Sequence, residues 1–311
     1  MNSTQITYLV FGIVLILAIV LDLDLLSKKG STVSIKKALF QTGFWVVLAL
    51  AFFVFLWFQN GHKMALEYLS AYLMEWSLSI DNIFVFILIF TFFRVKAEYY
   101  ARVLLIGILT AIVLRIVFIT VGIALVARFH WILYVFGALL VYTGFSMFRT
   151  KHDEAIHIED NTVYKFLKRL LPLTSGDGDG RWKILVDGKK KYTTLFVVVI
   201  LLATTDIVFA VDSIPAVFGL TQDKIVIYTS NIFAVLGLRS LFFLLRGAVA
   251  KFSHLQQGIA IVLIFVGLKM LSEIVGFSLP VYVSLLVILL CITTAILYSL
   301  YSEKKNKKIN P

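Results

Sequence analysis

The 311-residue chain contains a single cysteine, Cys291. One cysteine cannot form an intramolecular disulfide bond, and it cannot supply the group of thiolates that cysteine-based zinc sites use. The sequence also lacks a glycine-rich phosphate-binding loop, which argues against an ATP-driven activity. The H-E-x-x-H and G-x-S-x-G motifs of common hydrolases are absent as well. We therefore expect a protein that is not an enzyme and that has no resident cofactor.

Charged residues are also scarce, at 15% of the chain, whereas hydrophobic residues make up 60% and the mean hydropathy is +0.94. Although this length would suffice for two soluble domains, apolar runs of about 20 residues are typical of membrane helices. No basic residue precedes the first run, so we expect it to remain as a membrane helix rather than act as a cleaved signal peptide. The sequence predicts an all-α, polytopic membrane protein in which residues 1–311 form one transmembrane domain. Nine membrane helices are predicted near residues 6–26, 38–59, 67–93, 102–126, 131–149, 193–214, 225–245, 257–275 and 280–301.

The distribution of basic residues predicts the orientation of these helices. The chain has 29 Lys and Arg residues against 18 Asp and Glu residues, a net charge of +11. When the loops are assigned alternately to the two sides of the membrane, 23 basic residues fall on one side and three on the other. The richer side is cytoplasmic in membrane proteins, which places the N-terminus outside and the C-terminus in the cytoplasm. The basic excess thus reflects topology, and we expect the lipid bilayer, not nucleic acid, as the partner.

The one sizeable polar segment, residues 150–192, is predicted to be a cytoplasmic loop. Asp187-Gly188 lies between two short runs in this loop, Lys183–Val186 and Lys189–Thr194. An Asp-Gly pair between such runs is typical of a β-hairpin turn.

Two of the predicted membrane helices each contain a pair of carboxylates. Glu75 and Asp81 lie six residues apart in one apolar run, and Asp206 and Asp212 lie six residues apart in another. A charge at the centre of a membrane helix costs about 2.5–3.5 kcal/mol on insertion scales, and such residues are candidates for a functional site by default. We therefore take these four acids as candidate metal ligands.

The full set of charges inside the predicted helices is unbalanced. It contains five acids and three bases, so two negative charges are left over if all the groups are ionised. One divalent cation or two protons would balance them. In the alternative interpretation the acids only form ion pairs with the bases, and the four-residue spacing of Lys269 and Glu273 allows such a pair on one helix. The five acids of this set are the four paired acids and Glu273, and its three bases are Arg115, Arg239 and Lys269.

Six residues turn an ideal helix by about 600°, so the two acids of a pair point about 120° apart. They cannot share one ligand on the face of a straight helix. Pro215 predicts a break in the second copy, because its ring removes the hydrogen bond to the carbonyl of Val211. A broken helix would place that carbonyl and the carboxylate of Asp212 around one cavity. The first copy has Phe84 at the equivalent position.

The acidic pair belongs to a longer internal repeat. Leu114-Arg-Ile-Val-Phe118 is similar to Leu238-Arg-Ser-Leu-Phe242, and Tyr142-Thr-Gly-Phe-Ser-Met147 is similar to Phe265-Val-Gly-Leu-Lys-Met270. The offsets are 131 residues for the acids and then 124 and 123 for these motifs. The third to fifth predicted helices therefore repeat as the sixth to eighth. Because three is an odd number, the two copies face opposite ways, and inverted repeats of this kind are typical of secondary transporters.

The candidate ligands favour a hard metal ion. All of them present oxygen atoms, which suit Mn²⁺, Ca²⁺ or Mg²⁺ better than copper or zinc. The five histidines lie in loops or at helix ends, away from the acids.

Three stretches of the sequence resemble the signature motifs of the TerC family of integral membrane proteins. They are Glu75-Trp-Ser-Leu-Ser-Ile-Asp-Asn-Ile-Phe-Val-Phe86, Thr204-Thr-Asp-Ile-Val-Phe-Ala-Val-Asp-Ser-Ile-Pro-Ala-Val-Phe218 and Tyr228-Thr-Ser-Asn-Ile-Phe-Ala-Val-Leu-Gly-Leu-Arg-Ser-Leu-Phe242. Asp22, at the end of the first helix, also fits the family pattern. The family is named for tellurite resistance, and its members are associated with manganese export. By this resemblance, Glu75, Asp81, Asp206 and Asp212 match the acidic motif positions, and Asn82, Arg115, Asn231 and Arg239 match the polar ones.

Taken together, the residues and the resemblance predict a secondary transporter in a bacterial inner membrane that exports a divalent cation, with manganese as the favoured ion. The four paired acids would bind the ion with help from Asn82 and Ser213, and Arg115 and Arg239 would hold the empty acids in place. The alternative is a tellurite-resistance or stress component of the membrane that does not itself transport metal. Oxyanion transport fits less well, because an anion site needs a surplus of positive charge.

Overall fold

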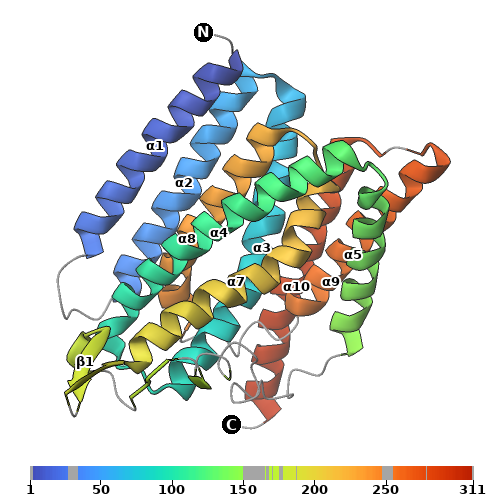
Figure 1. The fold of residues 1–311 in the computed structure, drawn as a ribbon. Helices are drawn as coiled ribbons and strands as arrows, with labels where there is room; N and C mark the ends of the chain where they lie inside the picture. Colours follow the sequence, from blue (N-terminus) through green and yellow to red (C-terminus); the bar gives the residue numbers. More distant parts are fainter. Residues whose placement is uncertain are drawn as a thin grey trace.

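The residues that the structure describes form a bundle of nine long helices with a small β-hairpin at one end (Figure 1). This computed structural model describes residues 3–26, 34–149, 165, 168–169, 171–174, 178–186, 188–246, 255–277 and 279–309. The helices are α1 (Ser3–Leu26), α2 (Ile35–Gln59), α3 (His62–Phe92), α4 (Tyr100–Arg128), α5 (Ile132–Arg149), α7 (Thr194–Phe218), α8 (Lys224–Leu245), α9 (Leu255–Ser272) and α10 (Val281–Ile309).

The all-helical, polytopic architecture agrees with the sequence prediction, and each predicted range overlaps one observed helix. Five helices of the described chain are long and apolar enough to cross a membrane: Ile35–Gln59, Ala97–Arg128, Thr194–Phe218, Lys224–Leu245 and Tyr282–Ser299. The number of nine membrane spans stays a prediction.

Two predicted helix boundaries are wrong in ways that matter for the chemistry. The third helix starts at His62 rather than at residue 67, which places Glu67 inside the helix, where it is buried. The expected break at Pro215 does not occur, because α7 continues through this proline to Phe218. Proline is tolerated in membrane helices when the surrounding helices satisfy the freed backbone groups.

Side chains and backbone at the helix starts explain where three of the helices begin. The Ser34 side chain caps α2 by accepting a hydrogen bond from the backbone N–H of Lys37 at 3.3 Å. Asp223 caps α8 by accepting from Ile225 N–H at 2.8 Å, and such caps satisfy donors that the helix itself leaves free. Gly61 joins α2 to α3 with a φ of 94°, a conformation that glycine adopts without strain.

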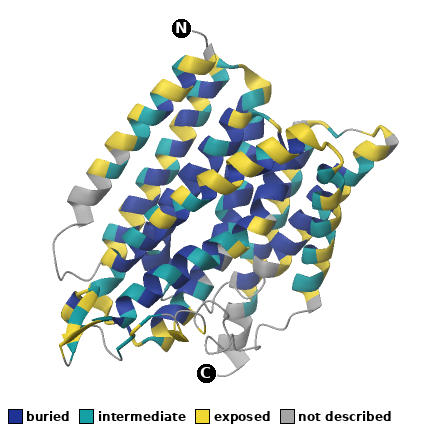
Figure 2. Cartoon of the chain, in the orientation of Figure 1, coloured by how far each residue is buried: buried dark blue, intermediate teal, exposed yellow. Residues whose placement is uncertain are grey.

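Helix α8 lies at the centre of the bundle and packs against α2, α3 and α4. In its most apolar 18-residue window, 94% of the residues are buried. By contrast, α1, α2, α4 and α10 carry many large apolar side chains on their outer faces (Figure 2), such as Phe58, which is 83% exposed. Such an apolar outer surface suits contact with lipid. The polar residues on α8 can therefore only face other helices.

Helices α5 and α9 pack along each other in opposite directions through close backbone contacts. A Cβ atom at Gly144 would lie 2.8 Å from the carbonyl oxygen of Ala260, and one at Gly267 would lie 2.6 Å from the carbonyl oxygen of Gly137. Only glycine allows helices to approach this closely, as is common in membrane proteins.

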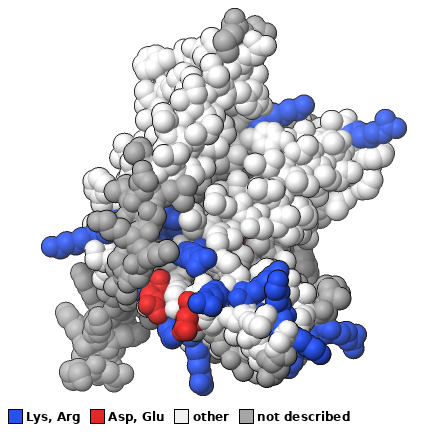
Figure 3. Space-filling view, turned by 60° about the vertical axis from the view of Figure 1, so that its left-hand side comes forward, with Lys and Arg blue, Asp and Glu red and all other residues white. Residues whose placement is uncertain are grey.

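The two ends of the bundle differ. The start of α1 lies beside the connection between α2 and α3, where the Thr7 hydroxyl donates a hydrogen bond to the Asn60 side chain at 2.9 Å. We call this the Asn60 end. The opposite, hairpin end carries β1 (Lys183–Val186) and β2 (Lys189–Tyr192), which pair antiparallel as predicted. Lys and Arg side chains gather at the hairpin end of the face seen in Figure 3. Most of the predicted cytoplasmic loop, including residues 150–164, lies outside the described residues.

Candidate functional site: a buried charged cluster

The side chain of Arg115 lies at the middle of the bundle and joins acids from two helices that are far apart in the sequence. Arg115 extends from α4 and is only 2% exposed. Its Nε donates to Asp206 Oδ2 at 3.1 Å, and its Nη2 donates to Asp206 Oδ1 at 2.9 Å. Its Nη1 donates to Glu75 Oε1. Two parallel hydrogen bonds to one carboxylate give the guanidinium a fixed orientation, so Arg115 holds both acids at once.

Two asparagines complete the inner contacts of the cluster. Asn231, on α8, donates from Nδ2 to the backbone carbonyl of Ile227 at 3.1 Å, and this bond directs its Oδ1 to accept from Arg115 Nη1 at 3.1 Å. Asn82, on α3, donates from Nδ2 to Asp206 Oδ1 at 3.4 Å. Four helices, α3, α4, α7 and α8, thus contribute to one polar site in an apolar bundle.

Several oxygen atoms around this site lack a hydrogen-bond partner among the described residues. They are Glu75 Oε2, Asn82 Oδ1 and Ser79 Oγ, all buried. Ser213 Oγ is also buried without a partner among the described residues, but it lies seven residues after Asp206 on α7, about 10 Å further along the helix axis. Glu75, Ser79 and Asn82 follow one another at spacings of four and three residues, which places them on one face of α3. A buried polar atom without a partner costs about 1–3 kcal/mol, so native proteins keep few of them without a reason. The described part of the site also carries one net negative charge, from two acids and one arginine.

Not every predicted site residue can be placed. Asp81 and Asp212 lie within α3 and α7, but their side chains are outside what the structure describes. The same holds for Asp22, near the end of α1. Arg239 is buried on α8, eight residues beyond Asn231, and is 4% exposed. Of the nine predicted residues, the structure therefore brings together Glu75, Asn82, Arg115, Asp206 and Asn231.

Among the side chains that the structure describes, no group of three or more His, Cys, Asp or Glu residues could hold a metal ion. The described oxygen atoms are instead of mixed type, from carboxylate, amide and hydroxyl groups. Ser79 was not among the predicted ligands. Its position one turn after Glu75 was the signal in the sequence that could have identified it.

The comparisons with known proteins agree with the geometry in pointing to a membrane protein. The model of the integral membrane protein TerC family matches residues 60–307. An uncharacterized membrane protein of Myxococcus xanthus is 43% identical over 287 residues, which cover 91% of this chain and 88% of the relative. A protein of Escherichia coli K12 named Alx, with a provisional description as a membrane-bound redox modulator, is 39% identical over 297 residues, covering 92% of each chain. The Alx protein of Salmonella typhi is 37% identical and covers 96% of this chain and 95% of its own. No solved structure matches the chain.

Proposed function

Because this chain belongs to the TerC family of integral membrane proteins, we propose that it is a secondary transporter that exports a divalent metal cation from the cytoplasm, with manganese as the favoured ion. It is a carrier rather than an enzyme. The cation is its substrate, and the hairpin end of the bundle faces the cytoplasm.

The observation that carries this proposal is the set of unpartnered oxygen atoms around a buried site with net negative charge. Glu75 Oε2, Ser79 Oγ and Asn82 Oδ1 are oxygen ligands of the kind that hard divalent cations bind, and Ser213, further along α7, is a ligand expected from the sequence. A cation there would satisfy these atoms and offset the negative charge. Asp81 and Asp212 are the further ligands expected from the sequence.

Arg115 acts in this proposal as a tethered cation that neutralises the acids while no metal is bound. Its guanidinium already occupies the space between Glu75 and Asp206. An arriving divalent cation competes for the same carboxylates, so Arg115 has to release at least one of them. Protons compete for the same oxygen atoms, which makes exchange of a metal ion for protons the natural coupling.

Two packing observations support the predicted inverted repeat, which relates α3, α4 and α5 to α7, α8 and α9. Helix α3 packs closely on α8, and α4 packs closely on α7. A two-fold rotation that exchanges the two copies would convert each of these pairings into the other. The 123-residue offset also maps Gly144 onto Gly267 and Gly137 onto Ala260. The contact of Gly144 with Ala260 thereby corresponds to that of Gly267 with Gly137.

An inverted repeat provides a mechanism for transport. If the two copies can exchange conformations, a site between them opens first to one face of the membrane and then to the other. Glu75 lies on α3 and Asp206 on α7, so each copy supplies one of the two acids. The site is therefore positioned between the moving parts, as alternating access requires.

Transport by the purified protein tests the proposal. Proteoliposomes with an imposed proton gradient should accumulate Mn²⁺, and Glu75→Gln and Asp206→Asn should each lower the initial rate at least about tenfold, since each removes a ligand charge worth more than ~1.4 kcal/mol. Glu98→Gln, an exposed acid outside the bundle core, is the control and should retain the normal rate. Normal transport by both site variants would contradict the assignment of the site. Absence of Mn²⁺ movement by the native protein would favour a stress-related membrane component that does not transport metal.

A further inference from the structure

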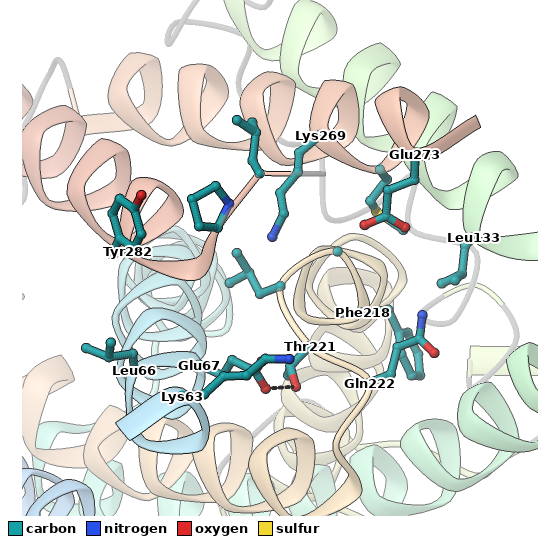
Figure 4. A pocket seen from close by; sticks show the side chains of 15 residues that line it. Lys63, Leu66, Glu67, Leu133, Phe218, Thr221, Gln222, Lys269, Glu273 and Tyr282 are labelled. Atoms are coloured by element: carbon teal, nitrogen blue, oxygen red, sulfur yellow. Dashed lines mark hydrogen bonds and ion pairs between the residues drawn. The ribbon is translucent and has the colours of Figure 1, made fainter. Parts of the chain in front are cut away.

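A cavity of about 600 Å³ opens at the Asn60 end of the bundle (Figure 4). Its walls come from the start of α3, the connection between α7 and α8, the end of α9 and the start of α10. Glu67 lies in this wall, eight residues before Glu75 on the same helix, which corresponds to about 12 Å along the helix axis. The cavity is therefore separate from the Arg115 cluster and lies between it and the Asn60 end.

One wall of the cavity holds a buried carboxylate. Glu67 is 9% exposed and accepts a hydrogen bond from the Thr221 hydroxyl at Oε2, over 2.6 Å. The ammonium of Lys63, one turn earlier, is 4.0 Å from Glu67 Oε1, and its side chain is 85% exposed. An ion pair at this distance and exposure contributes little, so Glu67 keeps most of its negative charge available to the cavity.

The opposite wall holds a buried lysine. Lys269 is only 6% exposed, and Figure 4 shows its amino group pointing into the cavity, towards the side that carries Glu67 and Thr221. The charges of Glu273 and Glu67 both act on it. Within the described part of the chain, however, its ammonium has neither a hydrogen bond nor an ion pair within 4.0 Å. The same-helix pair of Lys269 with Glu273, which the sequence allowed, is therefore not formed at contact distance. Because the rest of the Lys269 side chain is buried, its ammonium is held at the cavity wall and faces whatever the cavity contains, which points to a role beyond packing.

We propose that this cavity is a second binding site for a divalent cation, on the exit path, and that Lys269 is a tethered cation which the leaving ion displaces. The oxygen ligands are the carboxylates of Glu67 and Glu273 and the hydroxyl of Thr221. The proposal rests on the proposed export function, since it places the cavity after the Arg115 cluster. Lys63 also lines the cavity, but its side chain is 85% exposed and reaches solvent, so two carboxylates face Lys269 inside the cavity and an anion is a poorer occupant.

The positive charge of Lys269 lowers the affinity of this site for a divalent cation. While a metal ion is bound, the ammonium repels it, so the ion leaves quickly to the outside. Once the ion has left, the ammonium returns to the field of Glu67 and Glu273 and opposes binding of another cation from that side. Arg115 and Lys269 thus have the same proposed role at two successive cation sites, since each is a tethered positive charge that the cation displaces.

Mn²⁺ binding by the detergent-solubilised full chain tests this inference, because electron paramagnetic resonance distinguishes free from bound Mn²⁺. The measurement uses Glu75→Gln as the background, so that the inner site does not contribute. Adding Lys269→Met should raise the affinity for Mn²⁺ at least about tenfold, which corresponds to removing only ~1.4 kcal/mol of repulsion. Adding Glu67→Gln as well should abolish the gain. Lys224→Met, an exposed lysine at the same end of the bundle that does not line the cavity, should change the affinity less than twofold. An unchanged or lower affinity in the Lys269→Met variant would overturn the proposal.

A second measurement remains valid if Lys269→Met does not fold. Gln222 lines the cavity and is exposed, so a cysteine at this position, with Cys291→Ser to remove the native thiol, should react with a membrane-impermeant maleimide. Mn²⁺ should slow the reaction, K⁺ at equal ionic strength should not, and Glu67→Gln should remove the effect of Mn²⁺. Labelling that Mn²⁺ does not slow would refute the site. Both measurements report binding alone, so a protein that binds Mn²⁺ here but does not transport it would refute the proposed function and leave this site standing.

Discussion

At the scale of single residues, the protein stabilises buried acids with a positive charge of its own. Arg115 is shared between Glu75 and Asp206, which come from different helices. A buried ion pair gives little net stability compared with apolar packing, but breaking one by removing a single partner is costly. The role of Arg115 as a shared counter-charge can therefore be tested through the stability of the protein, without a measurement of transport.

Replacing Arg115 with alanine should destabilise the protein by about 3–5 kcal/mol, because Glu75 and Asp206 lose their counter-charge in a buried site. Thermal unfolding in detergent measures the effect. The double variant Arg115→Ala/Glu75→Gln should recover part of the loss, since one of the two uncompensated charges is gone. Arg128→Ala, at the exposed end of the same helix, is the control and should change stability by less than about 0.5 kcal/mol. Equal losses for Arg115→Ala and for the double variant would contradict the shared ion pair.

At the scale of elements, α5 and α9 pack against each other at glycine residues, and the helices direct polar side chains towards the inside of the bundle. Helix α7 accommodates Pro215 without ending, and α8 keeps Asn231 and Arg239 away from lipid because other helices surround it. The α5–α9 contact depends on backbone atoms that approach each other directly. Substitutions at this contact should therefore change how closely α5 and α9 pack, and not whether each of them forms a helix.

The substitution Gly267→Ala should destabilise this contact by about 1–3 kcal/mol, because the new Cβ would lie 2.6 Å from the carbonyl oxygen of Gly137 and the helices would have to separate. The thermal unfolding temperature in detergent should fall accordingly. Gly43→Ala, on α2, is the matched control, since a Cβ there meets no atom within 4 Å. Alanine is the better helix former, so the control should be neutral or slightly stabilising. A Gly267→Ala protein as stable as the control would show that α5 and α9 can separate at no cost.

At the scale of the whole molecule, the start of α1 and the end of α10 lie at opposite ends of the bundle (Figure 1). This arrangement agrees with an odd number of membrane crossings. The hairpin, whose strand β2 contains Lys189–Lys191, lies at the end of the bundle where α10 ends (Figure 1). The predicted orientation assigns that end to the cytoplasm.

Reporter fusions test this orientation. A reporter active only outside the cytoplasm should give no signal after Lys308 or in the hairpin turn at Gly188, and a strong signal at Lys224, because 23 basic residues on one side hold that side in the cytoplasm. Cytoplasm-active reporters at the same positions should give the reverse pattern. A strong outside signal after Lys308 would overturn either the orientation or the number of nine spans, and the signals at Gly188 and Lys224 would show which of the two is wrong.

The sequence by itself determined the class of protein, the positions of its helices and much of the candidate site. Apolar runs of about 20 residues are a local property, so the nine predicted helices needed no knowledge of packing. Glu75, Asp206 and Arg115 stood out for an equally local reason, since charged groups are expensive in a membrane helix, whereas Asn231 was identified by the resemblance to the TerC motifs. The similar motifs that predict a repeat were also visible, because finding them needs only a comparison of the chain with itself.

Only the tertiary structure decided which of these residues meet. That Arg115 holds both Glu75 and Asp206 depends on how α4 packs in the bundle with α7 and α3. No spacing in the sequence encodes these contacts, which join residues 40 and 91 positions apart. The place of Glu67 and Lys269 on facing walls of one cavity was hidden for the same reason, and also because the predicted start of α3 put Glu67 at a helix end. Pro215 predicted a break, but α7 continues through this proline. The local sequence determines where a membrane helix can form and which polar residues it contains. The packing of helices that are distant in the chain determines which of these polar residues meet to form a site.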